Sequence, residues 1–538
     1  MILRNPAVHR LDRLPEHFQS VTIGNTQGTP SYRPLVMVSY GLNYAWGKDN
    51  PVGYHVVNIA LHVMASAMAA LLLWQLLGCG VSAFWGAAVF ALHPIQTEAV
   101  NYITARSSVL YSLAAVAAVW AFARYRTTGR RFALSGAVAA YAASLLAKEA
   151  AVMVPLLLVG YDVVVRRCAW KDRSTWAAYV PFVVVTVVYL LWRQRMMGAV
   201  IPSSSVEGPL TVGLTFAAIV TKTLGGQLFP IDLSVSHAFG PIRTMTTQAL
   251  GAVAVCACLA GVAVGAWRRA PVLAYAALWF PAALLPVAAL TVITPLALYQ
   301  ENRGYLSAVA VALSAGPLLA WCWERSRARA VVVGLRRLGV IALLAAMVVA
   351  VIGRNPVWRD EVSLWRDVLA GAPGNQAAYL NLGLAYVVRG NFEAAEDVYL
   401  RALERFPYNA GVYVNLGQIY RTRGYSPAAE DVYLRTLERV PDNGLLHNGL
   451  GELYLARGEV ARAEDAFRTA IRVAPLFAMP YVNLALILDE QGARDAAIAA
   501  YQKFLELAPG QPGTAPHIEV ARQRLSALDR DGGAGRFP

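Results

Sequence analysis

Polar residues of the kinds that carry out acid–base and anion-binding chemistry interrupt an otherwise apolar sequence. The stretch ALHPIQTEAVNYITARSSVLY, residues 91–111, places His93, Glu98 and Arg106 between two hydrophobic runs. Carboxylates and imidazole can take up a proton, and arginine and lysine can hold an anion. Four further motifs contain the same residue types, at residues 32–58, 147–152, 230–237 and 299–306. Because charged side chains at membrane depth are usually functional, we expect the five motifs to form one cavity.

The composition places these motifs in a membrane protein. The chain has 538 residues, of which 57% are hydrophobic and 15% are charged, whereas a soluble protein has about 25% charged residues. Residues 1–354 hold 28 Lys and Arg against 11 Asp and Glu, while residues 355–538 hold 19 against 22. The excess positive charge therefore belongs to the apolar part and its loops, so we expect a lipid bilayer and no nucleic acid as partner.

We expect ten membrane-spanning segments, several of them short for the ~20 residues that a bilayer needs. They lie at about residues 55–77, 80–93, 107–123, 132–147, 150–165, 174–192, 247–267, 271–293, 304–323 and 338–353. Four basic clusters fall on one side of these spans, which the positive-inside rule makes cytoplasmic. The clusters are residues 124–131, 166–173, 267–269 and 324–337. The polar motifs and the chain after residue 354 are then expected on the outer, periplasmic face of a bacterial inner (plasma) membrane.

Residues 211–230 do not fit this pattern as an eleventh span. The segment is long enough to cross, but a crossing would put the basic clusters on opposite sides of the membrane. It also carries Lys222 and a Gly-Gly pair. A lysine in the middle of a bilayer is costly without a partner or a wet cavity, so we interpret the segment as re-entrant or interfacial.

The sequence after residue 354 repeats itself. Prolines recur every 34 residues at Pro373, Pro407, Pro441, Pro475 and Pro509, and glycines do so at Gly390, Gly424, Gly458 and Gly492. Two independent series with one period of 34 predict tetratricopeptide repeats, each a helix, a turn and a second helix. The predicted fold class is all-α, a polytopic helical membrane bundle followed by an α-solenoid. The predicted parts are an outer-face loop region at 1–54, the membrane domain at 55–354, a linking helix at 355–375, repeats at 376–409, 410–443, 444–477 and 478–511, and a capping helix and tail at 512–538.

A row of asparagines marks one position of the first helix in these repeats. Asn381, Asn415 and Asn483 share that position, and Gly449 interrupts the row beside Asn448. On the concave face of a superhelix, such a row would hydrogen-bond the extended backbone of an acceptor or partner protein. A purely local role, in which each amide satisfies nearby backbone groups, remains the alternative.

Read in order, the motifs resemble a known family. They are YRPL, LNYAWG and GYHVVNIALH, then HPIQTEAVNYI, LLAKEAAVMVPLLLVGYD, DLS followed by SH, and ENRGYL. Followed by 34-residue repeats, they resemble the transmembrane and TPR repeat-containing proteins, O-mannosyltransferase relatives of the GT-C class, and especially the bacterial members. The resemblance covers nearly the whole chain and implies a GT-C-like membrane domain.

The resemblance implies that a sugar, mannose, is transferred with inversion from a polyprenyl-phosphate donor to a Ser or Thr hydroxyl of a protein. The leaving phosphate develops negative charge and needs cations nearby. The residues predicted to bind the donor phosphate are Arg33, Arg106, Lys148 and Arg303, with Arg303 as first choice. The lipid-linked sugar is a substrate, and no Asp-rich cluster argues for a metal, so we predict no metal site.

The acceptor hydroxyl must give its proton to a carboxylate or an imidazole. The candidates are His93, Glu98, Glu149 and Glu301. Structural ion pairs, of Lys148 with Glu149 or of Glu301 with Arg303, are an alternative account of the same residues.

The sequence departs from the family at its beginning. The family carries an acidic pair a few residues upstream of an I..NP.V stretch, after a first span, and this chain begins MILRNPAV. We therefore expect the acids and that span to be encoded upstream, and we expect a glycosyltransferase only if they are present.

Two other classes of function remain open. A non-catalytic, membrane-anchored scaffold would use the repeats to gather partner proteins in the envelope, and it is favoured if the charges of the outer loops are dispensable. A lipid or polysaccharide transporter would show two related halves in its hydropathy pattern, and no such symmetry is visible.

Overall fold

The computed structural model describes residues 6–9, 16–18, 22–23, 30–48, 50–168, 173–197, 208–231, 233–234, 241–293, 301–324, 330–508, 511 and 513–533. The chain forms two compact units. The membrane unit comprises Met1–Thr22 and Ser31–Ala372, and the repeat unit comprises Ile23–Pro30 and Pro373–Pro538. The predicted all-α fold class is confirmed, because the strands described are only the pair β1 (Thr22–Ile23) and β2 (Pro30–Ser31).

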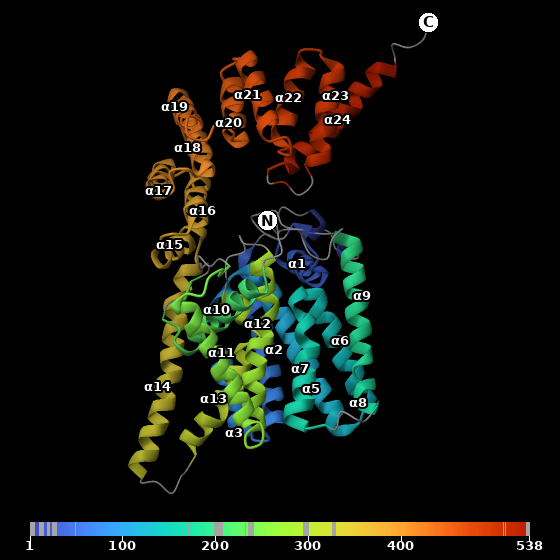
Figure 1. The fold of residues 1–538 in the computed structure, drawn as a ribbon, viewed down its shortest axis with the longest axis vertical. Helices are drawn as coiled ribbons and strands as arrows, with labels where there is room; N and C mark the ends of the chain where they lie inside the picture. The colour runs from blue at the N-terminus through green and yellow to red at the C-terminus, as the bar shows by residue number, and fades with distance from the viewer. Residues whose placement is uncertain are drawn as a thin grey trace. The chain divides into compact units, whose positions relative to one another are not determined.

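The membrane unit is a bundle of α-helices joined at its ends by short helical segments (Figure 1). Its α-helices are α1 (Pro34–Gly47), α2 (Pro51–Leu77), α3 (Gly80–Leu92), α4 (Gln96–Asn101), α5 (Arg106–Thr128), α6 (Arg131–Ala147), α7 (Val154–Gly160), α8 (Arg173–Ala177), α9 (Val180–Met197), α10 (Pro209–Leu228), α11 (Thr247–Ala266), α12 (Pro271–Ile293), α13 (Ala308–Trp323), α14 (Ala330–Arg354) and α15 (Glu361–Gly371). The short segments are η2 (Pro6–His9), η4 (Ile103–Ala105), η5 (Glu149–Met153), η6 (Tyr161–Arg166), η7 (Glu301–Gly304) and η8 (Asn355–Trp358).

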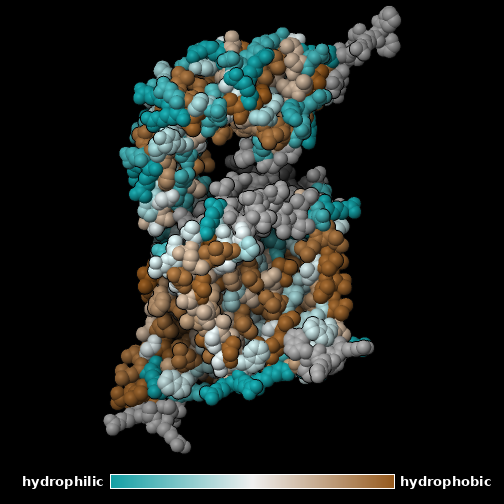
Figure 2. Space-filling model, viewed as in Figure 1, coloured by the Kyte–Doolittle hydropathy of each residue, from teal (hydrophilic) through white to brown (hydrophobic). Residues whose placement is uncertain are grey.

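The centre of this bundle is α5, which packs against α2 and α6, while α3 packs against α2 and α13. Small and aromatic side chains fill the interior, including the fully buried Trp279, Tyr141 and Phe122. By contrast, α11 and α14 bury little of their surface within the unit. Figure 2 shows apolar residues spread over the face of this unit that is in view, and many large apolar side chains of α2, α9 and α14 are exposed. An apolar exterior of this extent requires lipid or another apolar partner.

Five helical stretches are long and apolar enough to cross a membrane: Pro51–Leu77, Ile103–Thr128, Thr175–Met197, Thr247–Ala266 and Ala330–Trp358. Shorter apolar helices lie at Gly80–Leu92, Arg131–Ala147, Pro271–Val287 and Ala308–Trp323. These helices support a membrane protein, while the count of ten spans and the direction of insertion stay predictions. The 20-residue α10 is not among the five long candidates, and its expected re-entrant or interfacial placement also stays a prediction.

Basic clusters that are far apart in the sequence meet at one end of the bundle. Arg126 forms an ion pair with the buried Asp162, from Nη2 to Oδ2 over 2.5 Å. Arg167 donates to the backbone oxygens of Trp267 and Arg268, over 3.1 and 2.8 Å. Arg126 also donates to Cys168 Sγ over 3.6 Å, so three of the four predicted basic clusters contact one another, while the side of the membrane that they face stays a prediction.

The repeat unit contains four helix pairs and a final helix. The pairs are α16 (Gln376–Val388) with α17 (Phe392–Arg405), α18 (Ala410–Thr422) with α19 (Ser426–Leu437), α20 (Gly444–Ala456) with α21 (Val460–Val473), and α22 (Met479–Glu490) with α23 (Arg494–Leu507); α24 (Ala515–Gly533) follows. The 34-residue glycine series lies in the turn inside each pair, where the backbone has φ between +73° and +79°. This left-handed conformation strongly favours glycine.

A second glycine position lets the two helices of a pair approach closely. A Cβ atom on Gly383 would lie 2.2 Å from the ring of Tyr399, and one on Gly417 would lie 2.3 Å from the ring of Tyr433. These rings are buried in the repeat core. The glycine and the aromatic residue therefore interlock within each of these pairs.

Candidate functional site

Arg106, at the start of α5, lies at the centre of a structural network. Its side chain is fully buried. Its nitrogens donate to Asn58 Oδ1 over 2.7 Å and Asn43 Oδ1 over 2.8 Å, and to the backbone oxygens of Ser39 and Tyr54 over 3.2 and 3.1 Å. All of these acceptors are neutral. The structure therefore favours a role in joining α1, α2 and α5, and gives no support to the predicted role of Arg106 in binding phosphate.

His93 is fixed in a similar way at the end of α3. Its Nε2 lies 2.7 Å from the backbone oxygen of Gln227, and its Nδ1 accepts from the backbone nitrogen of Ile95 over 3.2 Å. A carbonyl oxygen can only accept, so Nε2 carries the hydrogen and the ring is neutral. With both nitrogens engaged and the ring buried, His93 is poorly placed to act as the predicted proton acceptor.

Glu98, in α4, holds the ENRG segment in place. Its carboxylate accepts from the backbone nitrogen of Asn302 over 2.8 Å and from Asn302 Nδ2 over 2.5 Å. Both side chains are buried. The C-terminal part of α10 supports the other side of this segment, since Gln227 Nε2 donates to the backbone oxygen of Gly304 over 3.1 Å. Glu98 thus positions η7, which carries Arg303, and its predicted role as a base finds no support in this geometry.

Lys148 is connected to the same segment through a serine. Its Nζ donates to Ser108 Oγ over 2.8 Å, and Ser108 Oγ donates to Asn302 Oδ1 over 3.0 Å. Lys148 and Ser108 are buried. Lys148 lies between α6 and η5, Ser108 lies in the first turn of α5, and Asn302 lies in η7. The ammonium group of Lys148 therefore links the start of α5, the connection between α6 and η5, and η7.

Arg33 and Glu149 form a bidentate pair beside this group. Arg33 Nε donates to Glu149 Oε2 over 3.1 Å, and Nη2 donates to Oε1 over 2.7 Å. Although burial alone would raise the pKa of Glu149, the charge and hydrogen bonds of Arg33 hold it well below its usual range. A carboxylate in this state is a weak proton acceptor. The predicted pairing of Lys148 with Glu149 is replaced by one with Arg33.

The electrostatics of Lys148 show that three of the four predicted cations share one region. Burial, together with the charges of Arg33 and Arg303, lowers the pKa of Lys148 to about 7. Arg193, near the end of α9, also acts electrostatically on Glu149, and its Nε atom is buried without a hydrogen-bond partner in the part of the chain that the structure describes. A buried region with this excess of positive charge is suited to bind an anion such as a phosphate.

Parts of the predicted site lie outside the described residues. They are residue 49, residues 232 and 235–237 of the DLS and SH motif, residues 299–300, and the side chain of Glu301. The predicted role of Glu301 as a base, and its pairing with Arg303, therefore stay predictions.

A pocket of about 250 Å³ opens near the start of the HPIQTE motif. It is lined by Pro94, Pro230, Ile231, Leu233, Ala350, Gly353, Arg354, Val357 and Asp367. The connection after α14 also contacts this motif, because Asn101 Nδ2 donates to Asn355 Oδ1 over 2.9 Å. The pocket is therefore bounded by two of the predicted polar motifs and by the segment that leads out of the membrane unit.

In the repeat unit, the three predicted asparagines are not equivalent. Asn483 is buried, and its Nδ2 donates to Asn448 Oδ1 over 3.0 Å. Asn415 makes a side-chain hydrogen bond to Tyr399, and Asn381 is half-buried. In the third repeat, where Gly449 stands in place of the asparagine, the neighbouring Asn448 therefore makes the hydrogen bond to Asn483. These contacts favour the local role for Asn415 and Asn483, and peptide binding stays a prediction.

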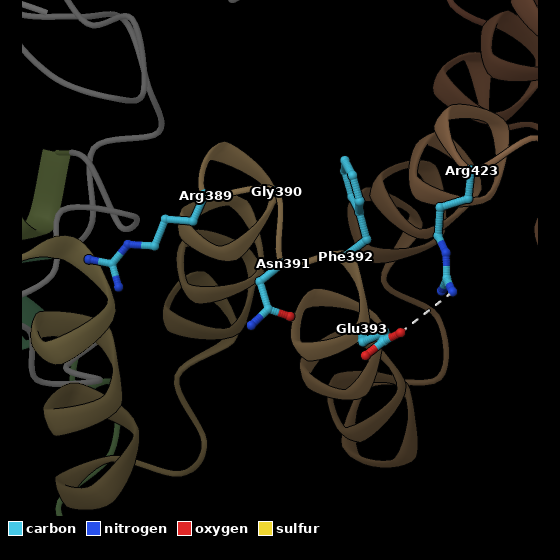
Figure 3. A pocket seen from close by; sticks show the side chains of 6 residues that line it. All are labelled: Arg389, Gly390, Asn391, Phe392, Glu393 and Arg423. Atoms are coloured by element: carbon cyan, nitrogen blue, oxygen red, sulfur yellow. Dashed lines mark ion pairs between the residues drawn. The ribbon is translucent and has the colours of Figure 1, made fainter.

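Ion pairs that follow the 34-residue period join successive repeats. Glu396 accepts from Tyr420 and Arg423 over 2.8 and 2.9 Å, and one repeat later Glu430 accepts from Tyr454 and Arg457. Arg423 also lines a pocket of about 390 Å³, in which its Nη2 lies 3.9 Å from Glu393 Oε1 (Figure 3). Its remaining lining residues are Arg389, Gly390, Asn391 and Phe392.

Ser108, Asn302 and Arg193 were not predicted as site residues. Asn302 lies inside the ENRGYL motif and Ser108 follows Arg106 by two residues, so the motifs contained a signal for both. Arg193 lies in the helix α9, outside the five motifs, and only the fold brings it near Glu149.

Comparisons with known proteins agree with both parts of the chain. A model of the tetratricopeptide repeat matches residues 362–410, 414–475 and 448–512. Protein O-mannosyl-transferase TMTC2 of Homo sapiens is 29% identical over 245 residues, covering 40% of this chain and 29% of that protein. Protein O-mannosyl-transferase Tmtc3 of Drosophila melanogaster is 24% identical over 471 residues, covering 70% of this chain and 49% of that protein. The chain thus spans less than half the length of either relative.

Among solved structures, a thermophilic TPR protein of Thermus thermophilus is 23% identical, with a TM-score of 0.27, covering 36% of this chain and 95% of that one. The resemblance inferred from the sequence motifs is confirmed by the repeat model and by the curated relatives. The chain carries tetratricopeptide repeats, and it is similar to proteins named O-mannosyl-transferases.

Proposed function

We propose that the chain is a membrane glycosyltransferase-like protein of the bacterial inner membrane. It transfers mannose from a polyprenyl-phosphate donor to Ser or Thr hydroxyls of proteins on the outer face. The observation that supports this most directly is the convergence of Arg33, Lys148 and Arg303 at one end of an apolar helical bundle. The curated relatives are named protein O-mannosyl-transferases, which suggests mannose as the sugar and a protein hydroxyl as the acceptor.

The residues of this cluster match the demands of the transfer. The acceptor oxygen forms a bond to the anomeric carbon of the sugar while the bond from that carbon to the phosphate oxygen breaks. The electron pair leaves with the polyprenyl phosphate, and the hydroxyl proton passes to a carboxylate. Fixed cations in a buried site stabilise the charge that develops on the leaving phosphate. Arg303 and Lys148 meet that phosphate, and Arg33, held by Glu149, adds a positive charge beside it.

In this proposal the Glu301 carboxylate is the base of the reaction, and it takes the role that the sequence resemblance assigns to an acidic pair upstream, so that transfer by this chain does not depend on that pair. His93 and Glu98 are engaged by fixed partners, and Arg33 lowers the proton affinity of Glu149. Glu301 adjoins Asn302 in η7, so a carboxylate there belongs to the segment that carries Arg303.

The repeats bind the acceptor or a partner protein in the same proposal. Tetratricopeptide repeats stack into extended surfaces that suit a polypeptide. Asn415 and Asn483 are engaged by neighbouring side chains, so the half-buried Asn381 is the first choice for contact with that polypeptide.

A non-catalytic scaffold is the second candidate function. It is favoured by the finding that His93, Glu98 and Glu149 all serve as fixed hydrogen-bond or ion-pair partners. In that case the chain would bind donor lipid or partner proteins without transferring sugar.

Mass spectrometry of envelope glycoproteins separates the two functions. Cells that lack the chain should lose hexose from Ser and Thr of a set of envelope proteins, and the wild-type gene should restore it. Arg303→Ala should fail to restore it, whereas Arg401→Ala, an exposed arginine of the repeat unit, should restore it fully. An unchanged set of glycopeptides in all strains would contradict the transferase and favour the scaffold.

A further inference from the structure

A chain of buried hydrogen bonds runs from Lys148 to Glu98 through two residues with no role assigned above. We propose that Ser108 and Asn302 are positioning residues that couple the carboxylate of Glu98 to the ammonium of Lys148 and hold that ammonium toward an anionic phosphodiester. This inference rests on the proposed function, because the phosphodiester is that of the sugar donor.

The direction of the chain follows from its two ends. An ammonium group can only donate, so Lys148 donates to Ser108 Oγ over 2.8 Å. The hydroxyl hydrogen of Ser108 is then left to donate to Asn302 Oδ1 over 3.0 Å. A carboxylate can only accept, so Asn302 Nδ2 and backbone nitrogen donate to Glu98 over 2.5 and 2.8 Å. Each hydrogen bond in the series therefore has one possible donor and one possible acceptor, with every donor on the Lys148 side and every acceptor on the Glu98 side.

Burial makes this chain strong. Ser108, Asn302, Glu98 and Lys148 expose 0%, 6%, 1% and 9% of their surfaces. Water therefore competes little, and hydrogen bonds that connect a cation to an anion strengthen one another in a low-dielectric interior. Ser108, Asn302 and Glu98 come from three different elements and Lys148 comes from the connection between α6 and η5. These hydrogen bonds therefore also fix how α4, α5, η7 and the start of η5 meet.

The charges around Lys148 explain why such a coupling is needed. Arg33 and Arg303 both disfavour its protonated form, while Glu149 and Glu98 favour it. The ring of Tyr111 lies 5.4 Å from Nζ and also favours the cation. Glu149 is taken up by Arg33, so Glu98 is the carboxylate that reaches Lys148 through hydrogen bonds. Without it, burial and two neighbouring cations would lower the pKa of Lys148 further.

The sign of the pH dependence follows from this environment. The pKa of Lys148 is lowered to about 7, so its charge is present below that pH and is lost as the pH rises. Binding of an anion should weaken over the same range. Breaking this series of hydrogen bonds should lower the pKa of Lys148 further, and the loss of anion binding should then begin at a lower pH.

The test measures how the full chain, reconstituted in lipid nanodiscs, binds farnesyl phosphoryl mannose between pH 5.5 and 9. This phosphodiester keeps one negative charge throughout the range, so changes report on the protein. Ser108→Ala should shift the midpoint of binding to lower pH by about one unit, with affinity at pH 5.5 within about threefold of the wild type. Ser108→Thr, which keeps the hydroxyl, should restore the wild-type midpoint.

Two further variants keep the result interpretable. Asn302→Leu breaks the next link and should shift the midpoint in the same direction, even if Ser108→Ala fails to insert. Ser112→Ala, one turn along α5 at another buried serine, should leave the midpoint unchanged. A merely structural role would reduce binding at every pH without moving the midpoint.

The possible failures can be told apart. Wild-type midpoints in both Ser108→Ala and Asn302→Leu, together with lost binding in Arg303→Ala, would overturn the coupling and leave the proposed function standing. No binding by the wild type at any pH would overturn both.

Discussion

Arg33 and Glu149, 116 positions apart in the sequence, face each other through two hydrogen bonds of 3.1 and 2.7 Å. The pair attaches the segment before α1 to the connection between α6 and α7. It also lowers the pKa of Glu149, because the neighbouring guanidinium stabilises the charged carboxylate. Glu149→Gln, which removes the charge and keeps the size of the side chain, can therefore distinguish a structural role of Glu149 from a role as the catalytic base.

We expect Glu149→Gln to reduce transfer by less than about tenfold, because a general base contributes about 10²–10⁴. The same variant should lower the thermal stability of the protein, since Arg33 would keep its charge without a counter-ion. Initial rates and melting temperatures of the purified variant check both effects. A loss of about a thousandfold in rate with intact stability would identify Glu149 as the base.

Arg106 should behave as a stability residue. Arg106→Ala would leave Asn43, Asn58 and two backbone oxygens without donors in the protein interior, at about 1–3 kcal/mol for each unsatisfied group. We expect a marked fall in the melting temperature in detergent and in the amount of inserted protein. A variant with normal stability and a selective loss of donor binding would return Arg106 to the phosphate site.

The repeats could be predicted from the sequence, whereas the roles of individual charged residues in the membrane unit could not. The repeats were predictable because Gly390 and Pro407 mark turns through their own backbone preferences, and the 34-residue spacing shows directly in the sequence. The roles of Arg106 and Lys148 were not predictable in this way. Asn43, Asn58 and Ser108 decide them, and these residues meet the two cations only after the helices pack.

The interlocked glycines of the repeats should resist even the smallest side chain. In Gly417→Ala the new Cβ would lie 2.3 Å from the ring of Tyr433, and relief of such a clash costs about 1–3 kcal/mol. Hydrogen exchange of α18 and α19 should become faster than in the wild type. The matched control is Gly374→Ala, because nothing lies within 4 Å of that position. Equal exchange in both variants would contradict this packing account.

The ion pairs between repeats should make the solenoid sensitive to acid. Burial opposes the charge of Glu430, but hydrogen bonds from Arg457, Arg462 and Tyr454 lower its pKa below the usual value. A lowered pKa means that the pair stabilises the folded state above the pKa of the unfolded chain, and that this stability is lost as the pH falls through the folded pKa. Protection of α20 and α21 against hydrogen exchange should therefore drop between pH 7 and pH 3.

The control for this prediction is Glu430→Gln, which removes the titrating group. Its protection should be lower at pH 7 by about 1 kcal/mol and should change less with pH than that of the wild type. The same pH dependence in both proteins would assign the acid sensitivity to other carboxylates.

The most direct test of the account is transfer by the purified full chain in lipid nanodiscs, given farnesyl phosphoryl mannose and a Ser/Thr-containing peptide. We expect mannosyl peptide and farnesyl phosphate to appear in equal amounts. Arg303→Ala should reduce the rate by about a hundredfold or more, because it removes a fixed cation from the leaving phosphate. Arg303→Lys should recover part of it, and Arg401→Ala should match the wild type. A wild-type chain that binds the donor yet forms no more mannosyl peptide than Arg303→Ala would contradict the account.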